Sequence, residues 1–341
     1  MAYRGFSNLT PFAADPFFLM DSRGAEVITF IVKGSYDLLE GGATVISESQ
    51  APIQVAAEHY GAPDTSSIKY DSEVAYTKNG TDCILIGHAQ VPGKVVTSVD
   101  VIFKAAGMVK AVRVSGDRCW KNRLGLWRAT PPLPFAKMPL VYELAYGGWD
   151  TSHQNKAFHG FCAHNPAGIG YIARKSRKEI EGARLPNLED PRAPLKDPKS
   201  DTVPAGFGYI APNWRPRLHY AGTYDEAWLN GRMPSLPDDF DIRFYNAASP
   251  GLTSPDHLKG GEPVEIINAS ARGRLRFDLP QDKLRAAVKM KTGGLLRRDL
   301  NLDTVIVNTD EGRLYLIWRA CLDLQQRIHD ILWTKTELCT H

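Results

Sequence analysis

The sequence predicts a mainly β protein with minor α content, in which antiparallel sheets form a sandwich or barrel-like core joined by long irregular loops. Two observations carry this prediction. Short β-branched runs recur along the 341 residues, whereas long amphipathic helical periodicity is scarce. Glycine and proline number 29 and 23, somewhat above the usual share, so turns are frequent.

The N-terminal part contains the first predicted strands. Residues 27–32 form a short β-branched run that is typical of a buried strand. Residues 83–89 and 95–103 follow as two further strands, and the alternating residues 108–114 are expected to pair next to them. These segments predict an antiparallel meander between about residues 80 and 115.

The middle of the chain is rich in proline, glycine, asparagine and aromatic residues, and it is poor in periodic segments. Residues 184–191 and 194–204 predict a long irregular loop, which in compact domains is usually functional or mobile. Residues 224–232 predict a short helix with Thr223 as its N-cap.

The last third of the chain returns to strands. Residues 264–268 and 273–280 alternate with period two, and residues 282–290 predict a helix. Residues 304–308 and 313–319 flank a glycine-containing turn and predict a hairpin. A faint echo of the first strand region in this hairpin leaves open a duplicated β-unit.

Three segments follow from these elements. Residues 1–150 are predicted to form an N-terminal antiparallel β-domain. Residues 151–260 form a loop-rich, aromatic region packed on it, and residues 261–341 form a C-terminal β-rich segment with a short helix. We expect the three segments to make one compact unit.

Composition and charge argue against several functional classes. A net charge of +3 is too small to argue for nucleic acid. The five cysteines are widely spaced, include no CxxC pair and suit a reducing cytoplasm. Residues 1–18 lack a charged leader before an apolar core, and no run approaches 18 apolar residues. Neither a signal peptide nor a membrane span is therefore expected.

One short segment carries four potential metal ligands. His153, His159, Cys162 and His164 fall within twelve residues, and zinc prefers histidine and cysteine in tetrahedral sets. Their spacing matches no zinc finger, and the segment is aromatic and glycine-rich. Packing and backbone hydrogen bonds are therefore the favoured interpretation, and neither a metal nor a cofactor is predicted.

Three carboxylates stand close together at Asp238, Asp239 and Asp241. A pair of acids could serve glycoside hydrolysis, with nearby aromatic loops stacking on sugars. The alternative is a turn that enters a strand, where aspartate caps free amides. No nucleophile elbow or SxxK motif accompanies them, so the sequence favours a protein that is not an enzyme.

Two glycine-containing segments predict fixed corners. Gly116, Asp117, Arg118 and Trp120 end one apolar strand. In this corner Asp117 is expected to accept turn amides, and Arg118 is expected to pair with a carboxylate such as Glu143. Gly147 and Gly148 close the next apolar run.

The basic side chains between residues 272 and 298 outnumber the nearby acidic ones. Nucleic-acid contact would need exposed aromatic residues there, and Phe277 is the only aromatic residue in this run. A solvated face, or a docking surface for an acidic partner, is the favoured interpretation.

An ordered set of motifs resembles a known bacterial family. No single block is specific, but their order is, and the resemblance covers about residues 5–280. The blocks include KNGTD at residues 78–82, GDR at 116–118, GGWD at 147–150, NPAGIG at 165–170, LPNLE at 185–189, AGTYD at 221–225 and LPDDFD at 236–241. In this order they are similar to the accessory proteins of type VI secretion that carry domain of unknown function 2169 (DUF2169).

This resemblance implies a cytoplasmic adaptor or chaperone. Such a protein is expected to bind a secreted toxin effector and help load it onto the spike, whose trimeric base and PAAR-type tip are the expected contacts. The family offers no catalytic residues to carry over. Neither a cofactor, a nucleic acid nor a membrane is an expected partner, and the oligomeric state stays open.

An adaptor of this kind should present an aromatic, partly apolar surface with a polar rim. The candidates come from the aromatic residues of the middle region, and each of them could equally belong to the core. They are Trp149, Phe158, Phe161, Tyr171, Phe207, Tyr209 and Trp214.

Overall fold

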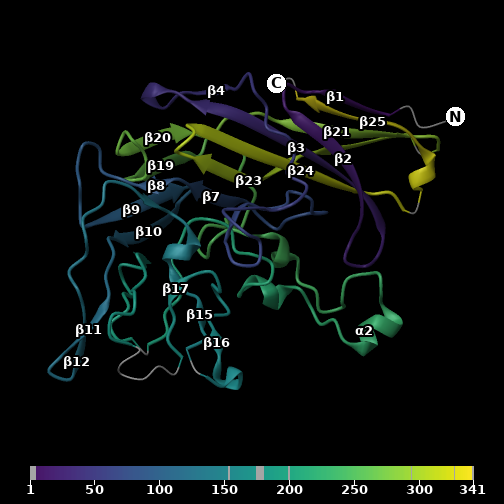
Figure 1. The fold of residues 1–341 in the computed structure, drawn as a ribbon. Coiled ribbons are helices and arrows are strands. Elements are labelled where there is room, and N and C mark those ends of the chain that lie inside the picture. Colours follow the sequence, from purple (N-terminus) through teal and green to yellow (C-terminus); the bar gives the residue numbers. More distant parts are fainter. Residues whose placement is uncertain are drawn as a thin grey trace.

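Strands dominate the architecture, as the sequence predicts, and the sheets are antiparallel or mixed (Figure 1). The structure is a computed structural model that describes residues 5–152, 154–173, 180–198, 200–292, 294–325 and 327–339. The larger sheets lie together in the upper part of the view, and the middle of the chain extends below them (Figure 1).

The largest sheet contains strands from both the first and the last part of the chain. Its strand order is β2-β3-β24-β23-β7, with β4 paired to the free end of β3, and all neighbours are antiparallel except β23 and β7. The strands are β2 (Ala13–Met20), β3 (Glu26–Leu38), β4 (Thr44–Ile46), β7 (Asp82–Ile86), β23 (Asn301–Asn308) and β24 (Arg313–Asp323).

Two sequence predictions are confirmed in this sheet. The buried run at residues 27–32 lies inside β3, and the hairpin of residues 304–319 is formed by β23 and β24. The two segments that echo one another in sequence, β3 and β24, are direct neighbours that pair from Val27 with Asp323 to Asp37 with Arg313.

A four-stranded sheet pairs the first strand of the chain with the last. Its order is β1-β25-β21-β22, and β1 runs parallel to β25 (Figure 1). The strands are β1 (Phe6–Leu9), β21 (Leu284–Met290), β22 (Leu295–Asp299) and β25 (Ile331–Leu338).

The predicted helix at residues 282–290 is wrong, because this segment forms β21. Alanine, leucine, lysine and methionine have good helix propensity, which favoured a helix. In the structure β21 is a central strand with β25 and β22 on its two sides. Its buried Leu284, Ala286 and Val288 alternate with the less buried Arg285, so tertiary pairing overrides the local preference.

A five-stranded sheet contains the predicted hairpin of residues 95–114. Its order is β18-β10-β9-β19-β20, and β9 and β10 pair from Ala105 with Met108 onward. The strands are β9 (Ser98–Ala105), β10 (Met108–Ser115), β18 (Leu188–Glu189), β19 (Pro263–Ile267) and β20 (Arg274–Asp278).

The predicted meander over residues 80–115 is wrong in its first strand. β7 does not pair with β9 and instead runs parallel to β23 in the largest sheet. Every residue of β7 is buried, which is typical of a strand covered on both faces. The chain then passes through Gly87 into β8 (His88–Ala89), which pairs with β13 (Met138–Pro139).

Short elements complete the middle of the chain. α2 (Glu226–Gly231) confirms the predicted helix, but its N-cap is Asp225, whose side chain accepts from the Trp228 amide at 2.9 Å. The short strands are β5 (Glu58–His59), β6 (Ile68–Tyr70), β11 (Trp120–Arg123), β12 (Leu126–Ala129), β14 (Tyr146–Gly147), β15 (Trp149–Asp150), β16 (Gly160–Phe161) and β17 (Ile169–Gly170). The 3-10 turns are Glu40–Gly42, Tyr142–Leu144, Lys156–Phe158, Arg217–Tyr220, Ile242–Tyr245 and Ile328–Asp330.

Two hydrophobic clusters hold the chain together. The main cluster contains residues from all three predicted segments, for example Phe30, Phe103, Phe207 and Ile306. A smaller cluster lies in the part below the sheets, and it positions the candidate site described next. It consists of Trp120, Tyr146, Cys162, Ile172, Ile180, Leu185 and Leu195. Among the described helices, none has the length and apolar character that a membrane crossing needs.

Candidate functional site

Two aromatic side chains form an exposed stacked pair. Trp149 on β15 lies directly opposite Phe161 on β16, and their ring centroids are 4.5 Å apart at an interplanar angle of 25°. Their exposed fractions are 57% and 46%. Large aromatic surfaces are normally buried, so a stacked pair left in solvent is typical of a contact surface.

A groove of about 480 Å³ runs beside this pair. Glycines form much of its wall, so the peptide backbone is approachable there without intervening side chains. Its two charged lining residues are already engaged: Glu181 accepts from the Asn122 amide at 2.9 Å, and Arg184 pairs with Asp117 at 3.2 Å. The remaining lining residues are Gly147, Gly148, Trp149, Gly168, Ile169, Gly170, Tyr171, Ile172, Gly182 and Ala183.

The paired glycines hold the groove and the aromatic pair in one geometry. The amide of Gly148 donates to the carbonyl of Asn165 at 2.8 Å, and its own carbonyl accepts from the Cys162 amide at 3.0 Å. Asn165 is fully buried, and its side-chain amide donates to the carbonyls of Tyr142 and Tyr146. Gly147 and Gly148 therefore lie in a backbone corner that contacts with Asn165 and Cys162 hold in place.

Gly148 occupies a position that other residues cannot adopt without strain. Its φ of 99° lies outside the range of ordinary side chains, and an added Cβ would overlap the carbonyl oxygen of Gly168. We expect Gly148→Ala to lower the free energy of unfolding by about 2–3 kcal/mol, measured by urea denaturation. Gly107→Ala is the matched control, because Gly107 has a φ of 84° with open space around it. Equal losses in the two variants would contradict the crowding at Gly148.

Buried polar groups anchor the base of the aromatic pair. Asp150 is 4% exposed and accepts from the Ser152 hydroxyl at 2.6 Å and from the Ala173 amide at 3.0 Å. Cys162 follows Phe161 and is buried in the smaller cluster. Burial raises the pKa of its thiol, which therefore stays protonated at neutral pH.

The other predicted aromatic candidates differ in how deeply they are buried. Phe207, Tyr209 and Trp214 lie in the main core, where they are not available to a partner. Phe207 packs edge-on against Phe103, as does Trp214 against Tyr142. Tyr171 is partly buried beside the groove. The side chain of Phe158 lies outside the described part of the structure.

The corner at residues 116–120 is formed with a different partner than predicted. Arg118 pairs with Glu189 at 2.5 Å and also donates to the Pro186 carbonyl. The predicted Arg118–Glu143 pair is therefore wrong, because Glu143 instead accepts from the amide and hydroxyl of Ser67. The chain returns past this corner through β18, which brings Glu189 within reach.

Further contacts fix the rest of this corner. Asp117 accepts from the side chains of Asn187 and Arg184, where turn amides were expected. An added Cβ on Gly116 would overlap the carbonyl of Leu133, and Trp120 is buried in the smaller cluster.

His153, one of the four potential metal ligands, lies outside the described residues. Among the residues that the structure describes, no group of three histidine, cysteine or acidic side chains could hold a metal ion.

The three carboxylates at residues 238–241 have partners of their own. Asp239 accepts from the amide and hydroxyl of Thr223, and Asp241 caps the turn at Ile242 and pairs with Arg243. Asp238 pairs with Arg232 at 3.2 Å in solvent. These contacts are those of turn and cap residues.

The sequence analysis did not predict an exposed hairpin, which lies on the same side of the sheets as the aromatic pair. β11 and β12 project downward (Figure 1). Leu124 in the turn between them is fully exposed, and Leu126, the first residue of β12, is 58% exposed. The apolar residues of the Arg123–Leu126 turn were the available signal, because two leucines around a turn glycine have no core to reach.

The comparisons with known proteins place the chain in a family. No curated protein and no solved structure matches it. A family profile described as an uncharacterized protein conserved in bacteria (DUF2169) matches residues 23–319. The matched range includes the aromatic pair, the glycine corner and the whole of β23. It extends past residue 280, at which the sequence motifs end. The chain therefore belongs to the DUF2169 family.

Proposed function

We propose that the protein is a cytoplasmic adaptor or chaperone that binds a type VI secretion effector and helps load it onto the spike. The motif set that resembles the accessory proteins of this system supports the proposal. The observation that carries it is the solvent-exposed stack of Trp149 and Phe161 beside the glycine-lined groove.

The physics of protein interfaces favours such a pair as an anchor. Tryptophan is enriched among the few residues that carry most of the binding energy of an interface. Stacking fixes both rings before binding, so less side-chain entropy is lost when a partner covers them. The backbone of β15 and β16 is fixed by the buried Asp150 and by the glycine corner, which makes the platform rigid.

The groove suggests what the partner presents. Its volume of about 480 Å³ suits a short extended segment, and its exposed lining is more polar than apolar. The glycine residues in the lining allow contacts with that segment's main chain. The occupant we propose is a short extended segment of the toxin effector, with the trimeric spike base and PAAR-type tip contacting the complex of adaptor and toxin.

Copurification tests the proposal with the full chain and the toxin encoded beside its gene. The wild-type chain is expected to form a stable complex. Trp149→Ala combined with Phe161→Ala should weaken the complex by about 30-fold or more in calorimetric titration, because both anchors are removed. Both side chains are exposed, so the thermal midpoint of the double variant should change little.

A matched control separates this site from general surface hydrophobicity. Tyr224 is 53% exposed and its ring packs against that of Trp228 on α2. α2 lies away from β15 and β16 (Figure 1). Tyr224→Ala is expected to bind the toxin as the wild type does. A wild-type chain that ignores both toxin and spike components would contradict the adaptor role. Equal affinities of the wild type and the double variant would contradict this site.

A further inference from the structure

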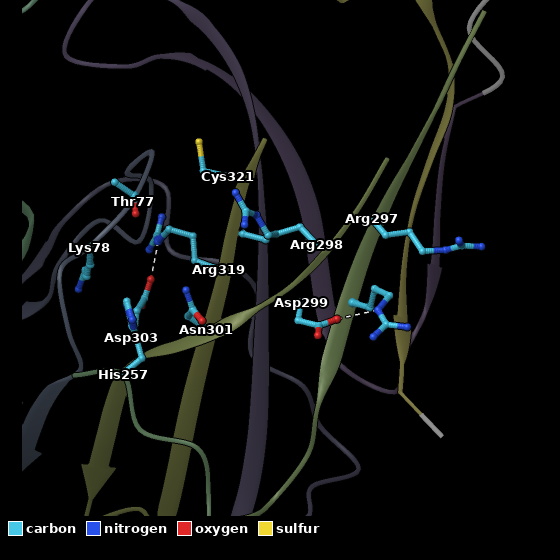
Figure 2. A pocket seen from close by; sticks show the side chains of 12 residues that line it. Thr77, Lys78, His257, Arg297, Arg298, Asp299, Asn301, Asp303, Arg319 and Cys321 are labelled. Carbon is cyan, nitrogen blue, oxygen red and sulfur yellow. Dashed lines mark hydrogen bonds and ion pairs between the residues drawn. The ribbon is translucent and has the colours of Figure 1, made fainter. Parts of the chain in front are cut away.

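A second groove, of about 620 Å³, lies where the four-stranded and largest sheets meet (Figure 2). Its lining includes five arginine and lysine residues against two aspartates. A concave surface lined by one sign of charge focuses its electrostatic potential and concentrates counter-ions. The groove is therefore a candidate anion site, on a different part of the fold from the aromatic pair.

The chain changes sheets at this groove. β22 ends at Asp299, the buried Leu300 follows, and β23 begins at Asn301 in the other sheet. The pairing of β23 with β24 then shifts register between Leu302 and Thr304, which makes Asp303 an extra, bulged residue. Bulges of this kind re-aim a side chain, and here Asp303 meets Arg319 on the neighbouring strand at 2.5 Å.

The cations at the inner end of the groove are held rigidly. Arg319 is 3% exposed and also donates to the backbone carbonyls of Ala75 and Glu73. Lys78 donates to Asp82 at 2.9 Å and to the Thr304 hydroxyl at 2.8 Å. These two side chains are paired, so they supply a fixed polar wall without being the primary ligands of an anion.

Arg297 and Arg298 supply the charge that is not compensated. Both are exposed, and among the described residues neither has a hydrogen-bond or ion-pair partner. The guanidinium of Arg298 extends toward Cys321 and Arg319, whereas Arg297 extends away from them (Figure 2). On the neighbouring strand, Arg285 is held instead by Asp299 at 2.6 Å. Asn301 and His257 also line the groove and carry neutral hydrogen-bonding groups.

We propose that this groove binds a small molecule bearing a phosphate or diphosphate group, with Arg298 as its principal ligand. The planar guanidinium matches a phosphate bidentately, and such charge-assisted hydrogen bonds are the strong ones. The volume lies in the range of small-molecule sites. A ligand with two or more negative charges fits the two lining cations, Arg297 and Arg298, that no carboxylate pairs with. The proposal does not depend on the adaptor role.

Calorimetric titration of the full chain with inorganic pyrophosphate at physiological salt tests the proposal. Binding to the wild type is expected, and Arg298→Gln should weaken it by about 10-fold or more, because a charge-assisted pair is lost. Arg298→Lys keeps the charge but loses the fork, so an intermediate loss is expected. Arg298 is exposed, so these variants should fold normally.

Arg276→Gln is the control, because Arg276 is exposed on β20, has no side-chain partner among the described residues and carries the same charge. It should bind pyrophosphate as the wild type does. Absence of binding to the wild type would overturn the proposal, and so would equal weakening in both glutamine variants. Tighter binding of an acidic peptide than of pyrophosphate, also lost in Arg298→Gln, would overturn the small-phosphate assignment in favour of a protein partner.

Discussion

Replacing Asp82 with alanine is expected to lower the free energy of unfolding by about 3–5 kcal/mol. Asp82 is fully buried on β7 and accepts from the Lys78 ammonium at 2.9 Å. It also accepts from the Ala247 amide at 2.9 Å and the Thr253 hydroxyl at 2.8 Å. One carboxylate therefore ties residues 246–253 to the largest sheet.

The expected loss comes mainly from what Asp82→Ala leaves behind. The Lys78 charge would stay buried with only the Thr304 hydroxyl, and the Ala247 amide would lose its acceptor. Guanidinium denaturation of the purified variant measures the change. Asp100→Ala is the matched control, because Asp100 pairs with Arg113 at 2.8 Å in solvent and should cost at most about 1 kcal/mol. Similar losses of unfolding free energy in both variants would contradict the conclusion that the burial of Asp82 causes the large loss.

Trp120→Ala is expected to cost about 3–5 kcal/mol by removing the largest side chain of the smaller hydrophobic cluster. Trp120 is 1% exposed and packs in the same cluster as Tyr146 and Cys162, which flank the glycine corner and β16. A cavity there should also loosen the platform that carries Trp149. We therefore expect weaker binding of the toxin effector together with the loss of stability.

Trp120→Phe tests whether the loss in Trp120→Ala comes from packing. The indole nitrogen of Trp120 is buried and has no hydrogen-bond partner among the described residues. Phenylalanine removes this unsatisfied donor and keeps most of the ring, so the cost should stay below about 2 kcal/mol. Thermal and urea denaturation of both variants measure the difference. A phenylalanine variant as unstable as the alanine variant would contradict the packing explanation.

Local pattern was sufficient for strands whose neighbours lie close in sequence. Residues 304–319 form the predicted hairpin because alternation and a turn signal coincide there, and the alternating residues 108–114 pair with the strand before them as expected. Local pattern did not predict strand pairs whose partners lie far apart in the sequence. β7 pairs with β23, more than two hundred residues later, and β21 is a strand only because β25 and β22 flank it.

Local sequence pattern is also insufficient to identify the candidate sites. Phe161 is exposed and Phe207 is buried, although both follow a glycine, because an aromatic side chain has the same pattern in a core as at a contact surface. In the basic run, Arg274 pairs with Glu265 and Arg285 with Asp299, while Arg298 faces a groove. Local charge counting could not separate these arginines, because their partners come from other strands.

The most direct test of the adaptor account is hydrogen–deuterium exchange of the full chain, free and in complex with the toxin effector. The account predicts new protection of the amides at residues 147–150, 160–162 and 168–172, which carry the aromatic pair and the groove. Protection confined to α2 and the neighbouring Tyr224, with these three segments unchanged, would contradict it.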